Sequence, residues 1–150
     1  MPAAKKRPTL ARHPKSRVPH AGAAPKLRLN PDPIERLRRI CLAQPEAVEI
    51  LSHGEATFKV GNGRVFAMVD NNHHHSGHIA VWCNAPPMVQ EILVESDPER
   101  FFRPPYVGHK GWVGVRLDYK VDWDEVARII DQAYQTSAAK KRAGVLRRSR

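Results

Sequence analysis

The sequence predicts an α+β domain of two layers, in which three helices cover a mostly antiparallel sheet of five strands. Three observations lead to this prediction. Three segments begin with a helix-capping pattern or a proline pair and continue with apolar side chains at helical spacing. An Asn-Gly pair at 62–63 is typical of a tight hairpin, and residues 112–117 alternate in the period-2 pattern of a strand. The predicted element order is α-β-β-β-β-α-β-α.

The first helix is predicted to begin at Asp32-Pro33-Ile34-Glu35, where Asp32 caps, Pro33 takes the first helical position and Glu35 completes a capping box. Ile34, Leu37, Ile40 and Cys41 then share one face, and Gln44-Pro45 ends the helix.

Four strands are expected next, at residues 47–51, 57–60, 64–69 and 78–83. The Asn-Gly pair joins the second to the third, and residues 71–77 form the following hairpin loop.

The second helix is expected to open at Pro86-Pro87 and to close at Asp97-Pro98. Its buried side is predicted to consist of Met88, Val89, Ile92 and Leu93.

A stiff, aromatic, proline-rich loop leads into the last strand, where Gly108, Gly111 and Gly114 permit backbone shapes or close approaches that a Cβ would block. The last helix is capped at Asp122 and is expected to run to about Ser137.

The net charge of +10 is concentrated at the two ends of the chain. Residues 1–30 hold eight Lys or Arg and residues 138–150 hold six, and neither segment contains an acidic residue. Residues 31–137 therefore keep the other 11 basic residues against all 15 acidic ones, a net charge of −4. The division predicts a basic, Pro- and Ala-rich disordered tail at 1–31, a domain at 32–137 and a basic tail at 138–150.

Clusters of cations attract the phosphates of nucleic acids without requiring a shaped site. The candidate nucleic-acid-binding residues are therefore those of the tails: Lys5, Lys6, Arg7, Arg12, Lys15, Arg17, Lys140, Lys141, Arg142, Arg147 and Arg148.

Two tryptophans are predicted to lie on the sheet face opposite the helices, because Trp82 and Trp112 alternate out of phase with Ile79, Val81, Val113 and Val115. An aromatic face of this kind marks a surface for a protein partner or a small ligand, or a minor core covered by the loop 103–111. Both interpretations stay open. The candidate surface comprises His53, Trp82, Tyr106, Lys110, Trp112 and Arg116.

No motif of enzymatic chemistry occurs in the sequence. His73-His74-His75 and His78 invite a metal site, but they lie in a hairpin loop with no carboxylate or thiol beside them in sequence, so none is predicted. Ser52, His53 and Glu55 are too close in sequence to converge as a triad, which favours a turn histidine. The prediction is a non-enzymatic protein without a cofactor.

Cys41 and Cys83 are far apart and form no C-x-x-C motif, which predicts buried, reduced thiols in a cytoplasmic protein. No apolar run is long enough to span a membrane, so no membrane association is expected.

Five segments together resemble the MmcQ/YjbR-like family of small bacterial proteins, and the resemblance covers roughly residues 32–137. The segments are residues 52–60 (SHGEATFKV), 65–68 (VFAM), 81–87 (VWCNAPP), 101–118 (FFRPPYVGHKGWVGVRLD) and 122–126 (DWDEV).

The resemblance implies a compact α+β fold with hairpin wings and a role in DNA binding, and it supplies no catalytic residues. Members often carry a basic residue where this chain has Asn84. A phosphate contact made by that residue would be missing here.

Overall fold

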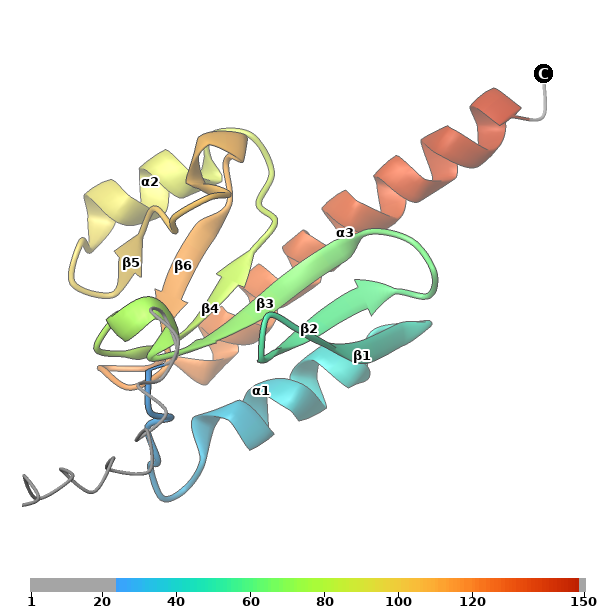
Figure 1. Cartoon of the computed structure of the whole chain (residues 1–150). Helices are drawn as coiled ribbons and strands as arrows, with labels where there is room; N and C mark the ends of the chain where they lie inside the picture. The colour runs from blue at the N-terminus through green and yellow to red at the C-terminus, as the bar shows by residue number, and fades with distance from the viewer. Residues whose placement is uncertain (1–23, 149–150) are drawn as a thin grey trace, which may run out of the picture.

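The computed structural model describes the backbone of residues 24–148 and the side chains of residues 24–139. Three α-helices, six strands and two short 3₁₀ helices make up this part of the chain (Figure 1). In chain order they are α1 (Pro33–Leu42), β1 (Ala47–Ser52), β2 (Glu55–Val60), β3 (Val65–Asn71), η1 (His73–His75), β4 (Ile79–Cys83), α2 (Val89–Ser96), β5 (Phe101–Phe102), η2 (Gly108–Lys110), β6 (Val113–Arg116) and α3 (Trp123–Arg148).

The strands form one sheet in the order β1-β2-β3-β4-β6-β5, and every neighbouring pair is antiparallel. The α+β class and the three helices are confirmed, but the sheet has six strands rather than five. The additional strand is β5, in which Phe101 pairs with Val115 and Phe102 with Gly114. A strand of two residues has no alternation to detect, so the sequence did not reveal it.

The main core lies on the face of the sheet covered by α1 and α3. On this face Val81 pairs with Val115 and Cys83 with Val113, and all four side chains belong to the core cluster. Tyr134 of α3 meets the ring of Phe66 edge-on at 5.6 Å between centroids. Figure 1 shows α3 crossing behind the sheet while α2 lies beside β5 and β6.

Helix α1 is capped as the sequence predicts, because the Asp32 carboxylate accepts the amide of Ile34 at 2.9 Å. The predicted buried side of α2 is partly wrong. Met88 and Ile92 are 69% and 60% exposed, whereas Gln90 is buried and Leu93 is half-buried. Met88 has a left-handed backbone and precedes the helix, so the helix starts later than expected and presents a different face.

Helix α3 continues to Arg148 instead of ending near Ser137. Ser137 and Ala138 are still buried against the domain, and the Ser137 hydroxyl donates to the carbonyl of Val65 at 3.1 Å. Beyond them the chain is rich in Ala, Lys and Arg, which are strong helix formers. No Gly or Pro that could end the helix occurs before Gly144. None of the helices described has the length and apolar character needed to cross a bilayer.

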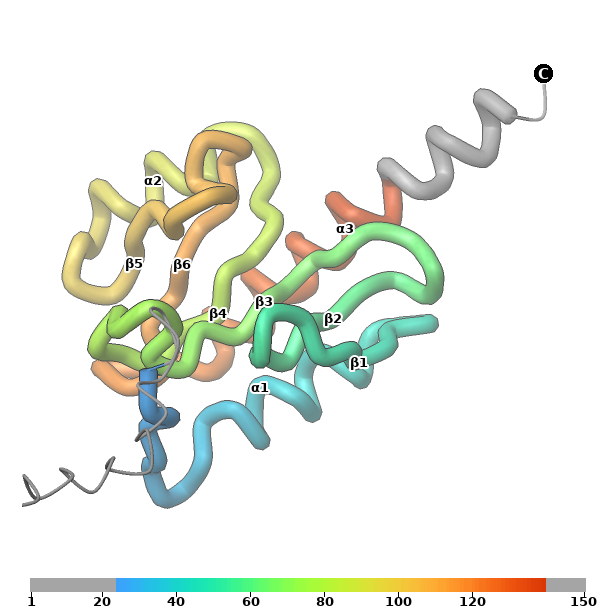
Figure 2. The backbone as a smooth tube through the Cα atoms, viewed as in Figure 1, coloured from blue at the N-terminus to red at the C-terminus, as the bar shows by residue number. Residues whose placement is uncertain are grey.

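The first described residues, which precede the domain start predicted at residue 32, are hydrogen-bonded to the domain. The Asn71 side chain bonds both the amide of Leu27, at 2.7 Å, and its carbonyl, at 3.0 Å. The Asn72 side chain donates to the carbonyl of Pro25 at 2.9 Å. Figure 2 shows this segment beside the turn between β3 and β4. The anchoring side chains lie more than 40 residues away, so no local pattern could have predicted the contact.

Candidate functional site

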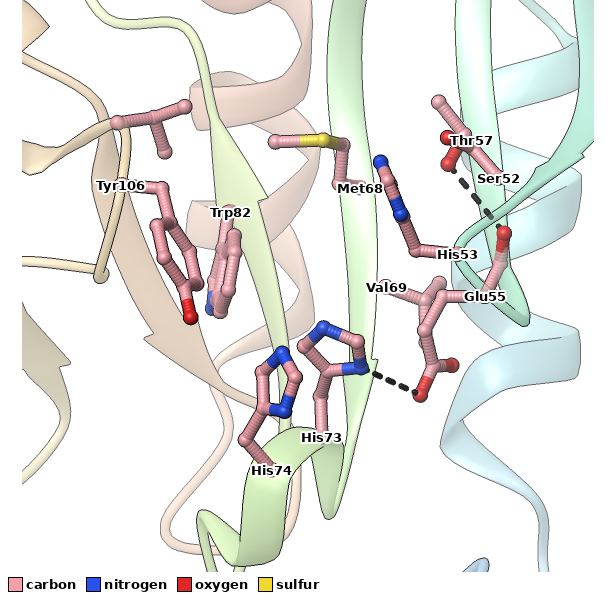
Figure 3. A pocket seen from close by; sticks show the side chains of 11 residues that line it. Ser52, His53, Glu55, Thr57, Met68, Val69, His73, His74, Trp82 and Tyr106 are labelled. Atoms are coloured by element: carbon pink, nitrogen blue, oxygen red, sulfur yellow. Dashed lines mark hydrogen bonds and ion pairs between the residues drawn. The ribbon is translucent and has the colours of Figure 1, made fainter. Parts of the chain in front are cut away.

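The face of the sheet opposite the main core carries a cavity of about 430 Å³ (Figure 3). Its floor is set by the strand register, since Thr57 pairs with Met68 and Met68 with Trp82, which places three side chains in one row across β2, β3 and β4. Loops at the ends of the strands complete the wall. The lining residues are Ser52, His53, Glu55, Thr57, Met68, Val69, His73, His74, Trp82, Tyr106 and Val107.

Four aromatic rings follow one another around this cavity. The Tyr106 ring lies 6.0 Å from that of His74, His74 lies 4.1 Å from His73, and His73 lies 6.1 Å from Trp82. The Trp82 and Tyr106 rings stand on the same side of the cavity in Figure 3, with the two histidines at one end. Tyr106, His74, His73 and Trp82 together form an aromatic row.

Asp70 fixes one end of the aromatic row from behind. Its buried carboxylate accepts the His73 amide at 2.8 Å, the Ser76 hydroxyl at 2.9 Å and the Trp82 Nε1 at 3.3 Å, and it pairs with His78 Nε2 at 2.9 Å. Burial favours a raised pKa for Asp70, but the hydrogen bonds from His78, His73 and Ser76 outweigh it and hold the pKa below its ordinary value. Asp70 is therefore a carboxylate at neutral pH.

Glu55 places a second buried carboxylate at the edge of the cavity, and it is 6% exposed. Lys26 forms an ion pair with Glu55 Oε1, the amide of Asn71 donates to the same oxygen at 3.4 Å, and His73 Nδ1 lies 3.8 Å from it. Glu55 thus lies between Lys26 of the N-terminal segment and His73 of the aromatic row.

The His73 imidazole is neutral at pH 7. Burial lowers its pKa below the ordinary value, and the neighbouring His74 lowers it further, although the Glu55 and Asp70 carboxylates act in the opposite direction. A neutral imidazole carries one ring proton and keeps the other ring nitrogen as an acceptor, and Nδ1 is the nitrogen that faces Glu55.

The structure brings together three of the six residues predicted for the domain surface. His53, Trp82 and Tyr106 line the cavity, whereas Lys110, Trp112 and Arg116 do not. Arg116 is held by Asp118 at 3.0 Å, and its guanidinium lies 5.2 Å from the centre of the Tyr119 ring. Trp112 lies one residue before β6, and its carbonyl accepts a hydrogen bond from Gln90.

Trp82 lies outside the main core cluster although it is only 6% exposed. The loop 103–111 contributes Tyr106 and Val107 to the cavity beside Trp82. The face of Trp82 is therefore partly covered by this loop, as a minor core would be, and partly lines a cavity, as a binding surface would. The loop shields Trp82 and leaves a cavity.

Glu55, His73 and His74 are site residues that sequence reasoning missed. In the sequence Glu55 lies in the turn before a predicted strand, and its spacing of two from Thr57 is the signal that both share one face. In the sequence, the run of histidines suggests only metal binding. Among residues 24–139, no three His, Cys, Asp or Glu side chains are grouped as a metal site requires.

The predicted phosphate-binding residues of the first tail, Lys5 to Arg17, lie outside the described residues. Those of the second tail up to Arg148 belong to α3 by their backbone, and their side chains lie outside the described part. Asn84 is buried, and its side chain donates to the hydroxyl of Ser137 at 2.8 Å. This position thus serves the contact between β4 and α3.

The YjbR family model matches residues 42–136. The chain belongs to the YjbR family. The match spans β1 to the first half of α3 and therefore includes every residue that lines the cavity.

A solved structure with the same fold is that of the Deinococcus radiodurans protein DR2400, which carries the domain DUF419. It is 22% identical to this YjbR-family chain, the TM-score is 0.58, and the similarity covers 67% of this chain and 75% of that one. Among curated proteins, none matches the chain.

Proposed function

We propose that this YjbR-family protein binds DNA through the sugar–phosphate backbone, without sequence preference, and that its two basic end segments carry the affinity. The observation that supports the proposal is the separation of charge along the chain. Fourteen of the 25 Lys and Arg lie in residues 1–30 and 138–150, where there is no acidic residue, and of these Lys26 is paired with Glu55 of the domain. Phosphate contacts release condensed counterions, so such segments bind DNA by charge alone.

The cations of the domain are poor competitors because several are already paired. Arg38 bonds Glu49 at 2.9 Å, Arg100 bonds Asp97 at 2.8 Å, and Arg116 bonds Asp118 at 3.0 Å. Each pair would have to be broken or bridged before the guanidinium could neutralise a phosphate. The net charge of −4 over residues 31–137 also repels a polyanion.

Helix α3 supports a specific role for the C-terminal segment. The helix has 26 residues, which corresponds to about 39 Å at 1.5 Å per residue, and it continues through the basic residues to Arg148. A continuous helix loses less conformational entropy on binding than a flexible tail does. We therefore expect the C-terminal segment to bind DNA as a preformed helix.

The test is a salt-dependent titration of a fluorescent DNA duplex with the full-length protein and three variants. One variant replaces Lys5, Lys6, Arg7, Arg12, Lys15 and Arg17 by Gln, and a second replaces Lys140, Lys141, Arg142, Arg147 and Arg148 by Gln. The third is a matched control that replaces five exposed domain cations by Gln: Arg39, Arg64, Arg103, Lys110 and Arg128.

If about 6–10 phosphates are engaged, the affinity of the full-length protein falls by roughly 10³–10⁵ between 50 and 200 mM salt. Both tail variants should weaken binding and reduce the salt slope by about 0.9 for each phosphate that is no longer neutralised. The control should leave the slope unchanged. A weakening in the control as large as in the C-terminal variant would contradict the proposal.

We further propose a cytoplasmic location. Cys41 and Cys83 are free, buried thiols, which is the usual state of cysteine in a reducing compartment.

A further inference from the structure

The cavity lies on the sheet face opposite the main core, which is called the open face. Its size and lining are those of a ligand site rather than of a packing defect. Protein interiors leave few voids larger than a water molecule, whereas small-molecule sites are mostly apolar cavities of about 300–1,000 Å³ with a few placed polar groups. The cavity of about 430 Å³ falls in this range, and its walls are aromatic and aliphatic, with Met68 and Val69 beside the aromatic row.

The indole of Trp82 is held in place before any ligand arrives. Its Nε1 donates to Asp70, which is itself fixed by the His73 amide and the Ser76 hydroxyl. Tyr106 differs, since it is 72% exposed and can adjust at the mouth of the cavity. A fixed ring beside an accessible one offers two aromatic surfaces on one side of the cavity, against which a flat molecule can stack.

Three of the side chains that line the cavity come from residues with a left-handed backbone. His53, His74 and Tyr106 have φ values of 52°, 50° and 67°, in the left-handed region that is unfavourable for residues other than glycine. All three line the cavity, and they come from three separate loops. The same region is adopted outside the cavity by Glu46, Asn72, His75, Met88 and Lys120, so these φ values describe how the three side chains are presented and do not by themselves mark a site.

Three polar groups at one end of the cavity, on Glu55, Thr57 and His73, can accept hydrogen bonds from a ligand. Glu55 is a carboxylate, and the Thr57 hydroxyl gives its proton to the Glu55 carbonyl at 3.3 Å, which leaves its lone pairs. The neutral His73 directs Nδ1 toward Glu55, and Figure 3 shows its other ring nitrogen on the opposite side. A ligand that satisfies these groups must donate hydrogen bonds.

We propose that the cavity binds a planar heteroaromatic ring with an N–H or amino donor, of the size of indole or adenine, against Trp82 and Tyr106 with its donor edge toward His73 and Glu55. None of the residues that line this site belongs to the basic end segments. Ring binding in the cavity can therefore be tested independently of DNA binding by those segments.

The test uses the full-length protein and follows the Nε1–H resonance of Trp82 by NMR during titration. A Trp82→Phe variant identifies that signal among the three indoles. Indole and 1-methylindole are the paired probes, because the methyl group removes the N–H donor and retains the ring. Indole should shift the Trp82 signal saturably, and 1-methylindole should bind more weakly.

Tyr106→Ala should weaken indole binding by about 5- to 150-fold, which corresponds to the loss of one base–aromatic stack. Tyr119→Ala is the matched control, since Tyr119 lies outside the cavity and bonds Glu99. Tyr106 is exposed, so its removal leaves the fold intact. Equal affinity for both probes, no shift at Trp82, or an unchanged affinity in Tyr106→Ala would each overturn the proposal.

A heteroaromatic ring can come from a free metabolite or from a base of bound DNA, and two further titrations distinguish them. Adenine supplies the free ring, and an oligodeoxyadenylate supplies the same ring on a backbone. Competition of the oligonucleotide with indole, abolished in Tyr106→Ala, would assign the ring to a DNA base. Binding of adenine without such competition would assign it to a free molecule.

Discussion

The Asp70 carboxylate is buried on the open face of the sheet and connects the histidine loop to Trp82. It accepts two hydrogen bonds from side chains at 2.9 Å, from Ser76 and His78, and one from a backbone amide at 2.8 Å. Charge-assisted bonds of this kind are stronger than neutral ones, and an unsatisfied buried partner is costly. A single side chain therefore determines the shape of a loop that the sequence shows only as a run of histidines.

Replacing Asp70 by Asn should destabilise the protein at pH 7 by ~1–3 kcal/mol, because the charge-assisted bonds are removed. The pKa of Asp70 is lower in the folded protein than in the unfolded chain, where it is about 3.9. Its contribution to the free energy of unfolding is present above that value and is lost as the pH falls through the folded pKa. The difference between wild type and Asp70→Asn should therefore shrink below pH ~4.

Urea unfolding between pH 3 and 7 measures this difference. Asp131→Asn, on an exposed position of α3, is the matched control and should have little effect at any pH. A difference that stays constant down to pH 3 would contradict the assignment to Asp70.

Gly114 gives a second case in which one residue decides the packing of a region. A Cβ on Gly114 would lie 2.3 Å from Cζ of Phe102 and 2.4 Å from its Cε2. Gly→Ala in a strand would otherwise stabilise by ~0.4–1 kcal/mol through the unfolded state. Overpacking costs ~1–3 kcal/mol, so we expect Gly114→Ala to be destabilising.

A double-mutant cycle measures this clash. In a Phe102→Ala background the same Gly114→Ala change should cost little, because the ring that occupies the space is absent. Additive effects of the two substitutions would show that the ring is not the cause.

At the scale of elements, the N-terminal segment at residues 25–27 is held by side chains that make the hydrogen bonds a neighbouring strand would make. Asn71 offers Leu27 one donor and one acceptor, as a neighbouring backbone would, and Lys26 adds an ion pair with Glu55. The segment therefore reaches the edge of the cavity without becoming part of the sheet.

We expect Asn71→Ala to release this segment, because two hydrogen bonds of ~0.5–1.5 kcal/mol each are removed. Amide hydrogen exchange at Leu27 should accelerate by roughly 5- to 150-fold, while exchange in β3 and β4 changes much less. Asn62→Ala, in the exposed turn between β2 and β3, is the control and should leave Leu27 unaffected. Unchanged exchange at Leu27 in Asn71→Ala would show that the segment is held by other contacts.

At the scale of the whole molecule, the sequence predicts the parts of the fold that local patterns specify. The Asp32 cap, the alternation around Val81 and Val115, and the resemblance to the YjbR family are all confirmed. The cavity escaped prediction because it depends on contacts between distant segments. Asp70 fixes Trp82 across a hairpin, and Tyr106 meets His74 across a gap of 32 positions.

The continuation of α3 beyond Ser137 was not predicted for a different reason. A basic, polar end segment indicates that no core is buried there, but it does not exclude a helix, since Ala, Lys and Arg favour helix in any case.

The two thiols offer a measure of the stability of the whole fold. Cys41 of α1 and Cys83 of β4 are fully buried in the core between the sheet and the helices. Burial raises the pKa of both thiols far above the ordinary value, and the nearby Cys83 raises that of Cys41 further. Because the thiolate is the reactive form, native Cys41 and Cys83 should react with Ellman's reagent only after the core opens.

For a domain stable by about 5 kcal/mol or more, we expect labelling of the native protein to be slower than that of the urea-unfolded chain by about 10³-fold or more. The unfolded chain should titrate two thiols. Core substitutions such as Leu37→Ala should accelerate both thiols together, because α1 and the sheet then open as one unit. Rapid labelling of Cys41 alone in the native protein would instead show that α1 opens separately from the sheet.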